Sequence, residues 1–84
     1  MLTVNEAISV FNQSYKDLTV TKAADFDNRH FLFCAVEDPN KTYYNDPFYL
    51  VNKKNGAINR FLPSENMNGF MNAITKKEID LNGA

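Results

Sequence analysis

The stretch His30-Phe-Leu-Phe-Cys-Ala-Val36 decides the fold of this 84-residue chain. Successive side chains of an extended segment point to opposite faces, and here both faces are apolar. Phe31, Phe33 and Ala35 share one face, and Leu32, Cys34 and Val36 share the other. A strand of this kind is normally covered on both faces. We therefore expect a buried β-strand over residues 30–36.

Three further segments have the pattern of strands. Residues 18–24 alternate in polarity and are rich in β-branched side chains, and residues 48–51 are again apolar on both faces. Residues 57–61 follow Asn55-Gly56, a pair suited to the positive φ of a tight turn. The short connections before the second strand and before the fourth predict a mostly antiparallel sheet.

A helix is expected near the N-terminus. Thr3 followed by Glu6 fits a capping box, in which each side chain satisfies the backbone N–H of the other residue. Apolar residues then recur at helical spacing and form one stripe: Val4, Ala7, Ile8, Phe11 and Tyr15. This pattern predicts a helix over residues 4–16.

A second helix is expected near the C-terminus. Pro63 and Ser64 favour a helix start, with Ser64 as the N-cap. Lys76 and Lys77 suit its C-terminal end, where the helix dipole favours cations. The apolar stripe between these signals consists of Met67, Phe70, Met71 and Ile74. Residues 78–84 are predicted to form a frayed tail.

This order of elements predicts a single α+β domain over residues 1–84, with a mostly antiparallel four-stranded sheet. Both helices are most simply placed on one face of that sheet. The opposite apolar face then needs a cover, because two of the strands are apolar on both sides. Either the loop over residues 39–47 folds back over that face or another chain covers it.

Composition excludes several classes of protein. A hydrophobic content of 44% and a net charge of −1 exclude intrinsic disorder. No apolar run approaches the ~18–20 residues that cross a bilayer, and the start of the chain lacks the basic stretch and apolar core of a signal peptide. The one cysteine excludes an internal disulfide and a cysteine-based zinc site.

Few residues are candidates for chemistry. His30 is the one histidine and has Asp25 and Asp27 nearby, but a metal site needs three or four convergent ligands, and a solvated turn explains these residues as well. Cys34 lies among apolar neighbours, which favours an inert buried thiol over a nucleophile. We therefore expect no catalytic residue, no metal and no cofactor, and we do not expect an enzyme.

Two groups of residues are candidates for binding a partner. The first is a set of aromatics within one loop and the strand after it: Tyr43, Tyr44, Phe48 and Tyr49. Tyrosine is favoured at recognition surfaces, although these side chains could instead fold back over the sheet. The second is a set of basic residues around the last hairpin and helix: Lys53, Lys54, Arg60, Lys76 and Lys77. These could bind nucleic acid or form an ordinary charged turn and helix end.

The segment Asp46-Pro-Phe-Tyr-Leu-Val-Asn-Lys-Lys-Asn-Gly-Ala-Ile58 is similar to the "Y-x-V-D-K-x-T-G-x-V" hairpin of small bacterial PepSY-type modules and of some immunity proteins. Asn52 and Asn55 stand where that pattern has Asp and Thr. Over nearly its whole length the chain most resembles short proteins of phages and prophages of Gram-positive bacteria. The resemblance implies an accessory or binding role without catalysis.

The sequence thus predicts a small non-catalytic protein-interaction module, as a phage or prophage accessory or virion-associated protein. We expect a protein partner or self-association into a homo-oligomer, and a location in the bacterial cytoplasm or the virion without membrane association. One alternative is an inhibitor or immunity-type protein that blocks a host or rival protein. The other is a nucleic-acid-binding accessory protein that uses the basic hairpin over residues 53–60.

Overall fold

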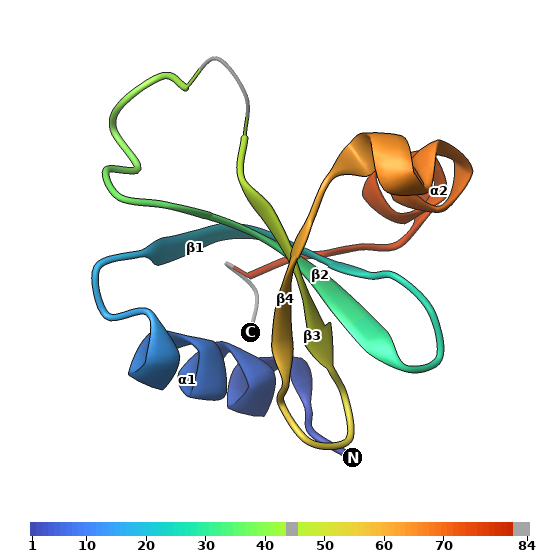
Figure 1. Ribbon diagram of the computed structural model, residues 1–84, viewed down its shortest axis with the longest axis horizontal. Helices are drawn as coiled ribbons and strands as arrows, with labels where there is room; N and C mark the ends of the chain where they lie inside the picture. Colours follow the sequence, from blue (N-terminus) through green and yellow to red (C-terminus); the bar gives the residue numbers. More distant parts are fainter. Residues whose placement is uncertain (44–45, 82–84) are drawn as a thin grey trace.

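An antiparallel β-sheet lies between two helices in the computed structural model, which describes residues 1–43 and 46–81 (Figure 1). The elements in chain order are α1 (Val4–Ser14), β1 (Thr19–Asp25), β2 (His30–Val36), β3 (Phe48–Asn52), β4 (Ile58–Phe61), a 3-10 turn (Pro63–Glu65), α2 (Met67–Lys76) and β5 (Glu78–Ile79). The strand order is β4-β3-β2-β1-β5, with every pairing antiparallel. The predicted α+β class is confirmed, and the sheet has five strands instead of the four predicted.

β2 is the middle strand of the sheet, with β1 on one side and β3 on the other. Every residue from Phe31 to Val36 is buried. These residues divide between two apolar clusters: Phe31, Phe33 and Ala35 belong to one, and Leu32, Cys34 and Val36 to the other. The clusters lie on opposite faces because the side chains of a strand alternate. The unbroken apolar run of β2 therefore contributes side chains to two half-cores, one on each face of the sheet.

α1 covers the first of these faces. Its buried residues Ala7 and Phe11 belong to the same cluster as Phe33, and the rings of Phe11 and Phe33 meet edge-on with 6.0 Å between their centroids. The predicted capping box starts the helix: the Glu6 N–H donates to Thr3 Oγ1 at 3.2 Å, and the Thr3 N–H donates to the Glu6 carboxylate at 2.9 Å. The bond from the Thr3 backbone lowers the pKa of Glu6.

α2 covers the opposite face, so the prediction that both helices lie on one face is wrong (Figure 1). Ala73 is fully buried in the cluster of Leu32 and Cys34, and the ring of Phe70 meets the ring of Phe48 edge-on at 4.8 Å. An apolar stripe shows which side of a helix is buried but not which face of the sheet it meets. The two-sided burial of β2 is satisfied by one helix on each face.

The loop between β2 and β3 also contributes to the second face. Tyr43 packs against the cluster that contains Val36, and its hydroxyl oxygen accepts the backbone N–H of Asp38 at 2.9 Å. The sequence predicts that either this loop or another chain covers this face, whereas in the structure α2 covers it together with Tyr43 of the loop. The apolar face therefore needs no second chain to cover Leu32, Cys34 and Val36, which are all buried.

The ends of the helices differ from their predicted positions. α1 ends at Ser14 rather than at residue 16, because Tyr15 leaves the helical region while its N–H still donates to a carbonyl of the last turn. The N-cap of α2 is Asn66 and not Ser64. The Asn66 side chain accepts the Gly69 N–H at 3.0 Å, and Ser64 instead lies within the 3-10 turn.

The predicted frayed tail is wrong for its first residues. Glu78 and Ile79 form β5, which pairs with β1 through the partners Ala24 and Ala23. Two residues are too few to show the alternating pattern of a strand in the sequence. They form a strand here because the chain passes the free edge of β1 directly after α2. Residues 82–84 of the predicted tail lie outside the described residues.

Gly56 supplies a test of how α1 is seated. It has a φ of +76°, and a Cβ at this position would lie 2.9 Å from Val10 Cγ1 of α1. We expect Gly56→Ala to lower the free energy of unfolding by about 1–2 kcal/mol, because an L-residue is strained in the left-handed region and its methyl group would crowd Val10. Denaturant unfolding measures the change. The double variant Gly56→Ala/Val10→Ala should show favourable coupling, and a Gly56→Ala protein as stable as the wild type would contradict the close seating.

Candidate functional site

A cleft of about 750 Å³ lies between α2, the sheet and the segment that joins β4 to α2. Its floor is the face of the sheet that carries Leu32, Cys34, Phe48 and Phe61, and Phe70 and Ile74 of α2 form one wall. We call it the α2 cleft. Its volume falls within the ~300–1,000 Å³ of ordinary ligand sites.

The aromatic side chains of the α2 cleft are held by one another. Phe48 and Phe61 are direct partners across β3 and β4. The Phe70 ring stands edge-on to Phe48 at 4.8 Å and lies 6.3 Å from Phe61. Edge-to-face packing of this kind favours one arrangement of the rings. The floor and wall are therefore preformed rather than assembled by a ligand.

Charged residues of both signs line the α2 cleft. Lys22 is the β1 partner of Cys34, and Glu78 of β5 is the partner of Ala24. Asp46 adds a second acidic residue before β3. These three charged residues are exposed, so they surround an apolar floor with a polar rim that reaches solvent.

The apolar surface continues beyond the cleft along α2. Met67 and Met71 lie one turn apart and follow Phe70 and Ile74 around the helix, and they are 51% and 46% exposed. Leu62, which lines the cleft from the connecting segment, is 52% exposed. Exposed apolar side chains therefore accompany the α2 cleft at two places: Leu62 in its lining, and Met67 and Met71 on the helix that forms its wall.

Cys34 lies at the floor of this cleft but is 2% exposed. Burial raises the pKa of its thiol, so little of the reactive thiolate forms near neutral pH. The position of Cys34 therefore favours a structural role as a buried apolar side chain, as the sequence predicts.

The structure does not gather the predicted aromatic residues on one surface. Phe48 is buried on the α2 side of the sheet. Tyr49 points to the α1 side, where its ring lies 5.2 Å from the ring of Phe11. Tyr43 packs over the sheet, and Tyr44 lies outside the described residues. Adjacent strand positions face opposite ways, which explains why a cluster in the sequence is divided in space.

The predicted basic residues are likewise divided. Lys53 pairs with Asp25, and its ammonium group lies 4.9 Å from the centre of the Phe31 ring. Its side chain is 12% exposed. Arg60 instead lies over the ring of Tyr49 at 5.2 Å. Two of the strongest candidate phosphate contacts are thus engaged within the domain.

The remaining basic residues lie at separate elements. Lys54 is exposed in the turn between β3 and β4, and Lys76 is exposed in the last turn of α2. Lys77 caps α2, and its carbonyl oxygen accepts the Asp25 N–H at 3.0 Å. The structure therefore shows no continuous basic strip along the predicted hairpin.

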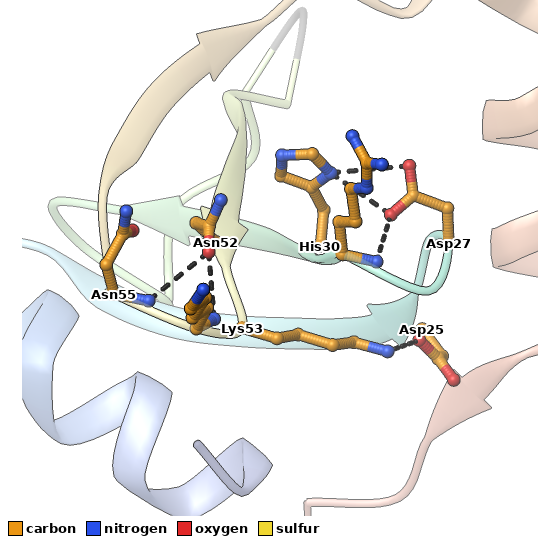
Figure 2. A network of polar contacts seen from close by, with 8 residues as sticks. Asp25, Asp27, His30, Asn52, Lys53 and Asn55 are labelled. Atoms are coloured by element: carbon orange, nitrogen blue, oxygen red, sulfur yellow. Dashed lines mark hydrogen bonds and ion pairs between the residues drawn. The ribbon is translucent and has the colours of Figure 1, made fainter. Parts of the chain in front are cut away.

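A network of polar contacts links the two turns at the other end of the sheet (Figure 2). Asp27 accepts the Arg29 N–H at 2.7 Å and lies 3.0 Å from His30 Nδ1. Partial burial opposes ionisation of Asp27, but the bonds from Arg29 and His30 outweigh it and lower its pKa. Within residues 1–43 and 46–81, no three His, Cys, Asp or Glu side chains converge as a metal site would require.

Comparison of the chain with protein-family models, with curated proteins and with solved structures finds no match. The resemblance to phage proteins and to the PepSY-type hairpin therefore stays a prediction. In the part of the chain that the structure describes, none of the helices has the length and apolar character needed to cross a bilayer.

Sequence reasoning did not identify the α2 cleft. The last helical stripe predicted that one side of α2 is buried, but it gave no sign that Met67 and Met71 would stay exposed.

Cys34 gives a direct test of the closed floor. We expect the native chain to react with a thiol reagent such as dithionitrobenzoate at least about tenfold more slowly than the urea-unfolded chain at pH 8, since the thiolate is both rare and shielded. The rate should keep rising above pH 8.5, the approximate pKa of an ordinary thiol. Absorbance at fixed reagent concentration measures both effects, and equal rates for the native and unfolded chains would contradict the buried floor.

Asp27 gives a test by pH. Because its pKa is lower in the folded chain, the ionised carboxylate stabilises the fold above the ordinary Asp pKa of about 3.9, and this contribution is lost as pH falls through the folded pKa. Asp27→Asn should therefore destabilise the chain at pH 6 by less than about 1 kcal/mol, a small effect because the carboxylate is half exposed. The free energies of unfolding of the wild type and of Asp27→Asn, measured by denaturant unfolding, should become equal as the pH is lowered from 6 to 2.5. A difference between the two proteins that persists at pH 2.5 would contradict the proposed role of the carboxylate.

Proposed function

We propose that this chain is a non-catalytic protein-interaction module whose α2 cleft takes an apolar segment of a protein partner. The observation that carries the proposal is a preformed cleft with exposed apolar side chains beside it: Leu62 in its lining, and Met67 and Met71 on the helix that forms its wall. Contiguous exposed apolar surface on a small domain is typical of interaction sites. Methionine is frequent at such surfaces because its flexible thioether adapts to different partners.

The lining of the cleft indicates the chemistry of the partner. The phenylalanine rings favour an aromatic or branched aliphatic anchor, the kind of side chain that carries most of the energy at protein interfaces. Lys22 supplies a positive charge at the rim of this floor, and Glu78 and Asp46 supply negative ones. A segment with an apolar anchor and flanking charges of both signs would complement the floor and the rim together.

This proposal keeps the predicted class of function and changes the surface. The aromatic loop is replaced by the α2 cleft, because Phe48 and Tyr49 face opposite sides of the sheet. The phage-accessory, inhibitory and nucleic-acid-binding roles stay predictions, and so does self-association. The features of the cleft favour none of these over the others.

The test is selection of a displayed library of random linear peptides on the immobilised full-length chain. We expect enriched peptides to carry an aromatic or aliphatic anchor. Binding to Met67→Lys/Met71→Lys should be at least about tenfold weaker by fluorescence anisotropy, since two exposed apolar contacts are lost. Lysine is a good helix former, so α2 should persist, and circular dichroism checks that it does.

Tyr15→Lys is the matched control. It removes an exposed apolar side chain, 40% exposed, from the opposite side of the domain, and it should leave peptide affinity unchanged. Equal binding of the selected peptides to the wild type and to Met67→Lys/Met71→Lys would contradict the proposal. If no peptide is enriched and small apolar molecules bind in the cleft, the proposed protein partner would be wrong and the cleft would be a site for a small ligand.

A further inference from the structure

A second hollow, of about 360 Å³, lies where the β1–β2 turn and the β3–β4 turn meet. We call it the turn hollow. Asn28 and Arg29 line it from the first turn, and residues 52–55 line it from the second. The Lys53 N–H donates to the Arg29 carbonyl oxygen at 2.8 Å, and the Leu2 N–H donates to the Lys53 carbonyl oxygen at 2.7 Å. The first bond fixes the two turns relative to each other, and the second ties the N-terminal segment to the β3–β4 turn.

The side-chain oxygen atoms of Asn52 and Asn55 in this hollow are used by the β3–β4 turn itself. Asn52 Oδ1 accepts the N–H groups of Lys54 at 2.8 Å and Asn55 at 3.2 Å, and Asn55 Oδ1 accepts the Ala57 N–H at 2.9 Å. Figure 2 shows the amide nitrogen of Asn52 directed away from the bonds that its oxygen accepts. The NH2 groups of Asn52 and Asn55 are therefore the parts of these side chains that can bind a ligand, and they act as hydrogen-bond donors.

The charges around the turn hollow are positive. Arg29 and Lys54 are both exposed. The charge of Lys53 is balanced by Asp25, which Figure 2 shows at the far end of its extended side chain. No carboxylate occurs among the described residues that line the hollow. The nearby Asp27 already accepts bonds from the Arg29 backbone and from His30.

We propose that the turn hollow binds one phosphate group, either free or carried on a small molecule. Near neutral pH a phosphate ester presents three acceptor oxygens, and hydrogen phosphate presents three acceptor oxygens and one hydroxyl group, which matches a site rich in donors and cations. The guanidinium of Arg29 suits two parallel bonds to such oxygens, and the ammonium of Lys54 acts as a point charge. Two exposed cations on a chain of net charge −1 suit one phosphate rather than the long backbone of a nucleic acid. The site is independent of the α2 cleft.

The experiment is a titration of the full chain with inorganic phosphate and with phenyl phosphate at constant ionic strength, followed by ¹⁵N NMR. We expect saturable shifts at residues 28–29 and 52–55, including the side-chain amides of Asn52 and Asn55. Arg29→Ala/Lys54→Ala should weaken binding at least about tenfold, since two charge-assisted contacts are lost. Tighter binding of phenyl phosphate would show that the site recognises a phosphorylated molecule. Tighter binding of inorganic phosphate would show that it recognises the free ion.

The matched control is Lys16→Ala/Lys41→Ala, which removes the same charge from the two loops at the opposite end of the sheet. It should change phosphate affinity by no more than about twofold. Equal weakening by both double variants would show that net charge alone is at work and would overturn the proposal. So would non-saturating or scattered shifts. A short oligothymidylate that binds far more tightly than phosphate, with steep salt dependence, would overturn the single-phosphate assignment in favour of a polyanion.

Discussion

The burial of β2 on both faces is the constraint on which the rest of this structure depends. A strand with six consecutive apolar residues cannot lie at the edge of an 84-residue domain or leave one face to solvent without exposing a large apolar area. The fold meets this requirement by pairing β2 on both sides and by placing one helix on each face. Each helix then needs an apolar stripe wide enough for one half-core only.

The two half-cores are closed to different degrees, and this difference produces the α2 cleft. α1 runs eleven residues across its face and buries Phe11 completely against the sheet. α2 is a ten-residue helix in which only Ala73 is fully buried, and its partly buried Phe70 and Ile74 face a cleft. The α2 cleft lies between this helix and the sheet, and Met67 and Met71 of α2 stay exposed.

The strand and helix segments could be predicted because their signals are local. The capping box at Thr3 and the apolar run of β2 each define an element without reference to the rest of the chain. The side of the sheet taken by α2 could not be predicted, because it depends on how the connection after Phe61 crosses the sheet. β5 was missed for a similar reason: Glu78 and Ile79 become a strand only beside the free edge of β1.

The same distinction separates the candidate sites. A run such as Tyr43–Tyr49 indicates which side chains are near in sequence, but strand alternation sends Phe48 and Tyr49 to opposite faces. The turn hollow shows the converse, because Arg29 and Lys54 are distant in sequence and are brought together by the bond between the Lys53 N–H and the Arg29 carbonyl. In the α2 cleft the buried residues form the floor, and exposed residues form the rim. Variants at the rim can therefore change binding while the fold persists, whereas variants at the floor change both.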